Sequence, residues 1–232
     1  MSNEVLWIFL LLVNFGSILL IYRLCGRTGL FVWIPIATIL ANIQVIKVIQ
    51  LFGFQATLGN IMYATTFLAT DILSENHGKK EAARAVFIGF FSLVAMTVIM
   101  NLVILFEPAP DDFAQESLKT IFSFMPRLAL ASFTAFAISQ FHDVWAFHAW
   151  KKRLPGTRYL WIRNNASTMI SQLIDTAVFV GIAFIGVFPR SVLIELFWTT
   201  YLLKFIVAAL DTPLVYLAKW MHGESDVSEP SV

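Results

Sequence analysis

Polar side chains inside long apolar stretches are the residues of this chain most able to do chemistry. A charge at the centre of a membrane-spanning helix costs at least about 2.5–3.5 kcal/mol, so such residues usually face a protein interior or a cavity. Four of them in the C-terminal third follow each other at steps of four, three and four residues, on one helical face: Asn164, Thr168, Ser171 and Asp175. Gln172 lies beside this stripe. We expect the stripe to lead from one membrane surface to the midplane.

The next apolar stretch carries a second charged group near its middle. Lys204 shares a helical face with Thr200 and Asp211, whereas Glu195, nine residues before Lys204, points to the opposite side. We therefore expect Glu195 at the outer interface and not in a cavity. Asp175 and Lys204 lie at similar depth on consecutive helices, so their side chains could meet. Such a pair either neutralises two buried charges or takes part in binding.

Polar residues also interrupt three earlier apolar stretches. In chain order they are Asn42, Gln44, Lys47 and Gln50, then Asn60, Asp71 and Glu75, then Ser132, Ser139, His142 and Asp143. Gln44 and Lys47 are three residues apart and lie on nearly the same face of a helix, and Asn42 points away from both. Polar stripes on five helices indicate a shared wet interior.

Some of these residues also have a purely structural interpretation. Ser132 and Ser139 belong to a stripe of small residues, which is typical of close packing between membrane helices. The Asn164-Asn165 pair could cap a helix N-terminus. Asp71 and Glu75 are expected near a membrane surface, where solvation is cheap, and we assign them to gating or coupling.

Short catalytic motifs are missing from the sequence. The strings His-Glu-x-x-His, Gly-x-Ser-x-Gly and Gly-x-x-x-x-Gly-Lys do not occur. Their absence disfavours an intramembrane enzyme and excludes ATP hydrolysis by this chain alone. The single cysteine, Cys25, excludes an internal disulfide and a multi-cysteine metal site. We expect no cofactor and no metal.

Helices that cross a lipid bilayer must position these residues. Hydrophobic residues make up 58% of the chain and charged residues 13%, with a mean hydropathy of +0.75, whereas soluble domains carry about 25% charged residues. Seven apolar blocks approach the length of about 20 residues that a spanning helix needs: 5–22, 30–52, 57–74, 84–106, 127–149, 165–187 and 191–219. The sequence therefore predicts an all-α membrane protein with one domain over 1–222 and a disordered cytoplasmic tail over 223–232.

The charges of the loops orient this bundle. Eleven basic residues fall in alternate joins and at the end of the last helix, against two on the opposite side, where the loops are acidic. By the positive-inside rule, the basic side is cytoplasmic. An odd number of helices, seven, keeps the basic loops on one side, with the N-terminus outside and the C-terminus inside.

Several long strings resemble the queuosine precursor transporters, also called the vitamin-uptake-transporter-like family. They are Leu40-Ala-Asn-Ile-Gln-Val-Ile-Lys47, the stretch 60–75 (Asn-Ile-Met-Tyr to Leu-Ser-Glu), Phe141-His-Asp-Val-Trp145 and the stretch 162–176 (Ile-Arg-Asn-Asn to Ile-Asp-Thr). The resemblance covers nearly the whole chain. It implies import of the cyano or aminomethyl deazaguanine base through the bacterial inner membrane. It also implies a similarity of helices two to seven to the six-helix S components of energy-coupling-factor transporters.

The resemblance gives the polar residues expected roles. A guanine-like edge presents two donors beside a carbonyl, which suit a carboxylate and an amide or lysine. The expected substrate-binding residues are Asn42, Gln44, Lys47, Asn164, Asn165, Gln172, Asp175, Thr200 and Lys204, and the expected gating or coupling residues are Asp71, Glu75, His142 and Asp143. Two alternatives stay open, a transporter that works alone and a binding subunit that needs a separate ATP-hydrolysing partner; the chain could also form homo-oligomers.

Overall fold

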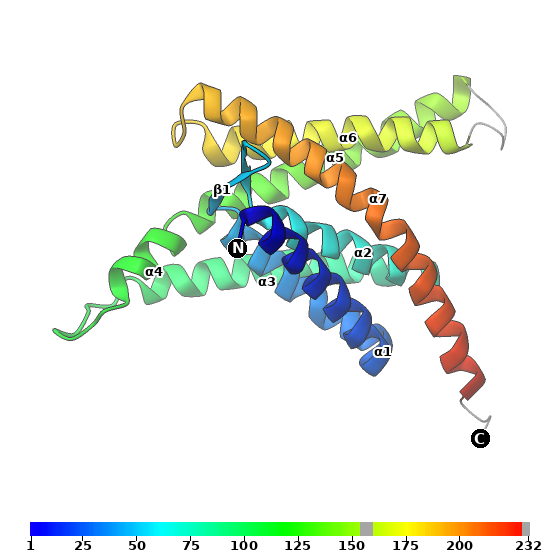
Figure 1. Ribbon diagram of the computed structural model, residues 1–232, viewed down its shortest axis with the longest axis horizontal. Coiled ribbons are helices and arrows are strands. Elements are labelled where there is room, and N and C mark those ends of the chain that lie inside the picture. Colours follow the sequence, from blue (N-terminus) through cyan, green and yellow to red (C-terminus); the bar gives the residue numbers. More distant parts are fainter. Residues whose placement is uncertain (154–159, 229–232) are drawn as a thin grey trace.

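The computed structural model describes the backbone of residues 1–153 and 160–228. Within those ranges it does not describe the side chains of 140, 143, 144, 147, 148, 150–153, 160–168, 207–213, 215, 216 and 219–228. Helices dominate the described part of the chain, and Figure 1 shows them running mostly along the long axis of the molecule. The elements are α1 (Asn3–Gln44), β1 (Val48–Leu51), β2 (Phe54–Thr57), α2 (Gly59–His77), α3 (Lys79–Val103), α4 (Gln115–Phe122), α5 (Met125–Arg153), α6 (Leu160–Phe184) and α7 (Arg190–Ser228).

Helix α1 consists of two helical segments joined by a sharp reversal at Gly26. This glycine has φ 53° and ψ −138°, a conformation that residues with a side chain rarely adopt. A Cβ atom on Gly29 would collide with the carbonyl oxygen of Ile21, so the second segment packs directly back on the first. Figure 1 shows the dark blue segment leaving the N-terminus and the lighter blue segment returning. The two segments correspond to the first two predicted spans.

The helix predicted over 30–52 is wrong beyond Gln44, because residues 48–57 form an antiparallel β-hairpin. Phe52 and Gly53 make its two-residue turn with φ values of 50° and 84°, the positive pair that a tight hairpin turn requires. Most residues from 45 to 52 are apolar, and a short apolar run does not distinguish a buried strand from a helix. Lys47 and Gln50 are therefore not on a helical face.

Hydrogen bonds tie the hairpin to the first turns of α1 and α7. The side-chain amide of Asn3 donates to the carbonyl of Gln50 at 2.8 Å, and the backbone N–H of Phe52 donates to Glu4 at 3.1 Å. On the other strand, the N–H of Gln55 donates to Glu195 at 2.7 Å, and the Thr199 hydroxyl donates to the carbonyl of Gln55 at 2.9 Å. The hairpin thus lies between the start of α1 and the start of α7.

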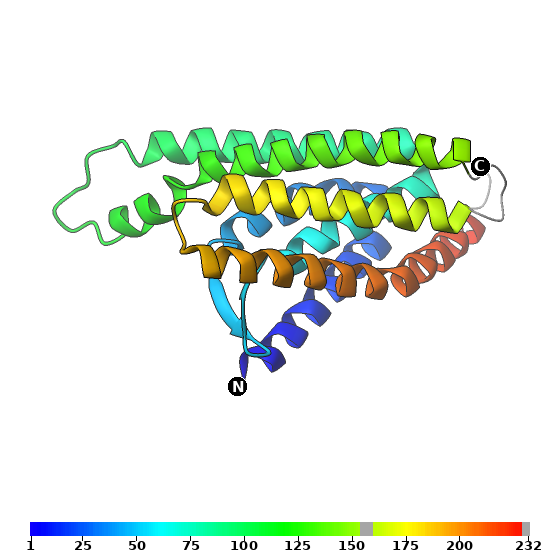
Figure 2. The ribbon, with the colours of Figure 1, turned by 90° about the horizontal axis from the view of Figure 1, so that it is seen from above.

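The two larger apolar cores of the described residues hold the helices together. One lies between both segments of α1 and helix α2, with residues such as Ile18, Leu30 and Leu68 fully buried. The other lies where α5, α6 and α7 meet near the α6–α7 turn, around Phe184 and Leu196. Figure 2 shows α5 and α6 running side by side. Helix α7 leans across α2 and the hairpin and closes the space between these two groups of helices.

Three stretches of the described chain are long and apolar enough to cross a membrane: Asn3–Gln44, Lys79–Val103 and Gln115–Ser139. Large apolar side chains on α3 face outward, including Phe87 at 71% and Phe91 at 64% exposure. Such surfaces match lipid and not water. The chain is therefore a mostly helical membrane protein.

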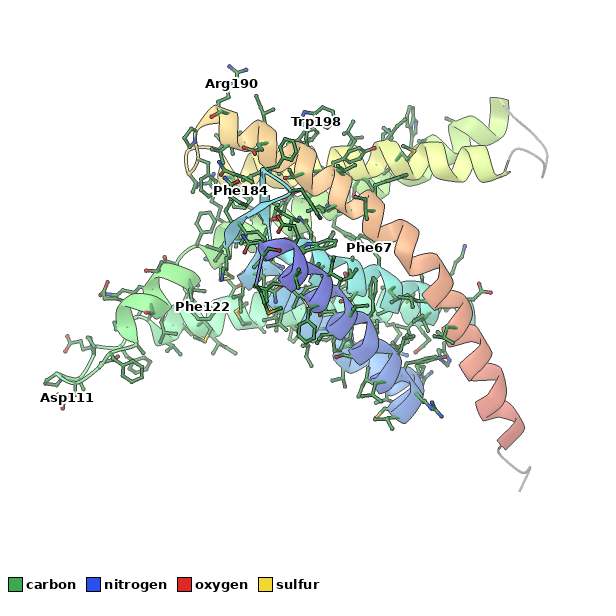
Figure 3. All side chains as sticks on the ribbon, viewed as in Figure 1. Phe67, Asp111, Phe122, Phe184, Arg190 and Trp198 are labelled. Atoms are coloured by element: carbon green, nitrogen blue, oxygen red, sulfur yellow. The ribbon has the colours of Figure 1, made fainter. Side chains whose placement is uncertain are left out.

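Two segments differ in extent from the sequence prediction. The short helix α4 lies in what was predicted to be a loop, and the α3–α4 connection projects from one end of the molecule, with Asp111 at its tip (Figure 3). Helix α7 continues as far as Ser228, into the stretch predicted as a tail. Residues 229–232 of that predicted tail lie outside the described residues.

Candidate functional site

A buried ion pair lies where α5, α6 and α7 approach α2. The ammonium nitrogen of Lys204 is 2.5 Å from Oδ2 of Asp175, and the two side chains are only 10% and 6% exposed. The hydroxyl of Ser139 donates to the other carboxylate oxygen at 3.5 Å. The Lys204 nitrogen also lies 4.9 Å from the centre of the Tyr63 ring, within range of a cation–π interaction. Each charge is therefore compensated inside the protein.

A pocket opens beside this pair. The space between its walls, with the part that is open to solvent included, is about 410 Å³. Its walls come from α1, α2, α5, α6 and α7, through Ala41, Asn42, Val45, Gly59, Asn60, Tyr63, Ser132, Ala135, Asp175, Phe179, Thr200 and Lys204. Two aromatic rings, Tyr63 and Phe179, are part of the wall, so a flat ligand has surfaces on which it can stack.

Close contact between α1 and α2 shapes the part of the pocket near Gly59. A Cβ atom on Gly59 would lie 2.5 Å from the carbonyl oxygen of Ala41 and 3.1 Å from the backbone nitrogen of Val45. Only glycine permits this approach. As a result, Asn60 at the start of α2 and Asn42 near the end of α1 line the same small space.

Some polar groups of the wall are already used within the protein. Ser132 donates to the side-chain carbonyl of Asn42 at 2.8 Å, and the Asn42 amide donates to the backbone carbonyl of Thr38 at 2.9 Å. These bonds fix the α1 and α5 walls of the pocket. A preorganised wall of this kind lowers the ordering cost of binding.

Other polar atoms of the wall have no partner among the described residues. These are Oδ1 of Asn60, the hydroxyl of Tyr63 and the hydroxyl of Thr200, although Asn60 and Thr200 are each only 4% exposed. The pocket therefore presents groups that a polar ligand would satisfy.

A second polar contact lies farther along the α5–α6 interface. Nδ1 of His142 is 3.0 Å from the hydroxyl of Ser171, which is 5% exposed. Ser171 lies one helical turn from Asp175, and His142 lies one turn from Ser139. The described part of the predicted polar stripe of α6, Ser171 and Asp175, thus contacts α5.

The structure brings four predicted binding residues into one pocket, namely Asn42, Asp175, Thr200 and Lys204. Three others lie off its wall. Lys47 is exposed on the turn before the hairpin, and Gln44 and Gln172 are half-buried, each with a side-chain oxygen that has no partner among the described residues.

The remaining predicted residues fall in other places. Asp71 and Glu75 are exposed on α2, away from the pocket wall, and His142 is half-buried between α5 and α6. As predicted, Glu195 is away from the pocket wall and binds the hairpin. The side chains of Asp143, Asn164, Asn165 and Asp211 lie outside the described residues.

Sequence reasoning did not assign Asn60, Tyr63, Ser132, Ser139 or Phe179 to the site. Ser132 and Ser139 look like packing residues, and they do pack, but they also hold Asn42 and Asp175 in place. One signal was present: Asn60 and Tyr63 are three residues apart and so share a helical face. Among the side chains that the structure describes, no group of three or more His, Cys, Asp or Glu residues could hold a metal ion.

Comparison with known proteins gives consistent matches. The family described as "Putative vitamin uptake transporter" matches residues 57–218. A Bacillus subtilis protein named "Probable queuosine precursor transporter" is 48% identical over 95% of this chain and 96% of its own length. Proteins with that function in their names from Haemophilus influenzae and Escherichia coli are 31% and 29% identical, over 57% and 59% of this chain and 54% and 58% of theirs. No solved structure matches the chain.

Proposed function

The chain belongs to the vitamin uptake transporter family, and on that premise we propose that it imports queuosine precursors through the bacterial cytoplasmic membrane. The observation that carries this function is the 48% identity, over nearly the full length of both chains, to a relative named for queuosine precursor transport. The mostly helical fold and its long apolar segments fit a transporter and not an enzyme.

We place seven spans in the membrane, two from α1 and one each from α2, α3, α5, α6 and α7. Two sets of contacts support this topology. Arg27, beside the reversal of α1, lies 3.3 Å from Glu81 at the start of α3, so the first and third joins share one end of the molecule. The N-terminus, the hairpin and the start of α7 meet at the other end. Because the first and third joins are basic, their end is cytoplasmic in this proposal.

The pocket chemistry suits a deazaguanine base. Such a base presents an N–H and an amino group, which a carboxylate accepts, beside a carbonyl, which an ammonium group satisfies. Asp175 and Lys204 supply these two groups within one pocket. Because Asp175 and Lys204 bind each other at 2.5 Å, the base must separate the two side chains. It then takes the place of Lys204 at the carboxylate and of Asp175 at the ammonium group. Binding is thereby coupled to a rearrangement between α6 and α7.

The other predicted residues have roles away from the wall in this proposal. His142, with Ser171, continues the polar contacts from the ion pair along α5 and α6, and we assign His142 to coupling. Asp71, Glu75 and Asp143 keep their proposed role in gating. Asn164, Asn165 and Gln172 keep the role in substrate binding that the sequence predicts for them.

Complementation tests the proposal. A bacterial strain that cannot make the precursor but keeps the later enzymes should regain queuosine in its tRNA when it carries this protein and receives nanomolar precursor. Unchanged tRNA, with the protein shown to be in the membrane, would mean that the substrate is wrong. The same test in a host without any energy-coupling-factor ATPase separates a self-sufficient transporter from a binding subunit, because only the former restores queuosine there.

A further inference from the structure

Asn60 is held in one orientation at the start of α2. Its side-chain nitrogen lies 3.2 Å from the carbonyl of Thr57 and 3.4 Å from the Thr57 hydroxyl. A carbonyl can only accept a hydrogen bond, so the amide nitrogen must be on this side. The amide oxygen is then directed away from Thr57.

Asn60 lies in the pocket wall, with its amide oxygen on the side away from Thr57. The residue is 4% exposed, and its hydrogen bonds within the described part of the chain use only the amide nitrogen. The amide cannot rotate to exchange its two ends without losing its bonds to Thr57. The pocket therefore presents a fixed acceptor at this point, and a ligand that donates there would satisfy it.

The position of Asn60 places this acceptor away from the ion pair. Tyr63, which touches the Lys204 ammonium, lies three residues later on α2, roughly 4.5 Å farther along the helix axis. Asn60 is on the far side of Tyr63, near Gly59 and the hairpin. Asn60 and Asp175 both line the pocket, so two separate parts of its wall offer acceptors to a flat bicyclic ligand.

We infer that Asn60 is a specificity-determining residue that accepts a hydrogen bond from the pyrrole N–H of the free base. This inference rests on the proposed function. A deazaguanine base has donors at both ends: the N–H and amino group of the six-membered ring, and the N–H of the five-membered ring. When the N–H and amino group of the six-membered ring donate to Asp175, the N–H of the five-membered ring donates to Asn60. In a nucleoside this ring nitrogen carries the sugar and has no hydrogen, so the site admits the free base and rejects its nucleoside.

An isosteric pair of ligands tests the contact. The competitors are the cyano base and its furo[2,3-d]pyrimidine counterpart, in which a ring oxygen replaces the pyrrole N–H. Each competes with labelled precursor for uptake by cells carrying the full-length protein, which yields two inhibition constants for each variant. With wild type we expect the oxygen analogue to compete about 10- to 100-fold more weakly, since two acceptors then face each other.

The ratio of the two inhibition constants should depend on residue 60. In Asn60→Leu, which keeps the volume and removes the acceptor, we expect the ratio to fall to within about threefold of unity. In Asn60→Asp, which keeps an acceptor, the preference for the N–H compound should remain. If Asn60→Leu does not reach the membrane, Asn60→Ala provides the same comparison.

The outcomes separate the two proposals. A ratio that stays as high in Asn60→Leu or Asn60→Ala as in wild type would overturn the role of Asn60 and leave the transporter function intact. Failure of wild type to take up the precursor would overturn the proposed function and this inference together. The contact between Asn60 and the pyrrole N–H is supported if the ratio of inhibition constants falls in Asn60→Leu or Asn60→Ala and stays high in Asn60→Asp.

Discussion

Replacing Asp175 by Asn separates a structural ion pair from a substrate-binding carboxylate. Asp175 and Lys204 are 6% and 10% exposed with their charged atoms 2.5 Å apart. Removing one member of a buried pair usually costs about 3–5 kcal/mol, because the other charge is left uncompensated. If the pair is only structural, Asp175→Asn and Lys204→Met should each lower the amount of folded protein, and the double variant should restore both abundance and uptake.

The surroundings of Lys204 reduce this cost for Asp175→Asn. An asparagine oxygen can still accept from the ammonium group, and the Tyr63 ring 4.9 Å away adds a cation–π interaction of about 0.5–2 kcal/mol. We therefore expect Asp175→Asn to reach the membrane at near normal abundance. It should still lose uptake, by about 100-fold in efficiency, because an amide accepts only one of the two donors of the base and opposes the other. The double variant should stay inactive.

Uptake of labelled precursor, normalised to membrane abundance, measures both outcomes. Glu116→Gln is the matched control, because Glu116 and Lys119 form an exposed pair at 3.6 Å whose loss should change neither abundance nor uptake. Near wild-type uptake in Asp175→Asn at equal abundance would refute the binding role. Recovery of uptake in the double variant would show that the pair is structural.

Three further predictions follow from the same contacts. Single cysteines at 111 and 152 in a Cys25→Ser background should react with an impermeant maleimide from outside intact cells at 111 only; labelling of 152 would contradict the proposed orientation. Gly59→Ala should lower the melting temperature of the purified protein, at a cost of about 1–3 kcal/mol, because its Cβ would lie 2.5 Å from the Ala41 carbonyl; Gly16→Ala, with nothing within 4 Å, is the control and should be neutral or stabilising. Gly53→Ala should cost about 1–2 kcal/mol because φ is 84° in the hairpin turn, and a melting temperature equal to that of Gly16→Ala would argue against a tight turn there.

Local pattern was enough to find most of the helices and the family. The strings around Asn42, Asn60 and Asp175 resemble the queuosine precursor transporters, and relatives named for queuosine precursor transport confirm this resemblance. The meeting of Asp175 and Lys204 was expected from their similar depth on consecutive helices, and the structure places them in contact. The second inference uses position along consecutive helices, because a helix converts spacing in the chain directly into depth.

The hairpin and the α2 side of the pocket could not be found in this way. Residues 48–57 are apolar enough to continue a helix, and only pairing between the two strands and their contacts with α1 and α7 makes them a hairpin. The chain has 22 Phe, 7 Trp and 5 Tyr, and no sequence motif distinguishes Tyr63 from the other aromatic residues as a binding residue. Its role follows from the Lys204 ammonium against its ring.

The sequence by itself determined that the chain is a membrane protein, where most of its long helices lie, and which polar residues must avoid lipid, because the bilayer imposes its length and polarity on each segment separately. Tertiary structure decided which of those polar residues meet. Asn42 enters the pocket while Gln44 and Lys47, close by in sequence, stay off its wall. The physical reason is that side chains from five helices converge only through the rotation and crossing of each helix. Packing between helices fixes the rotation and the crossing of each helix. The close approach of α1 and α2 at Gly59 is one such packing contact.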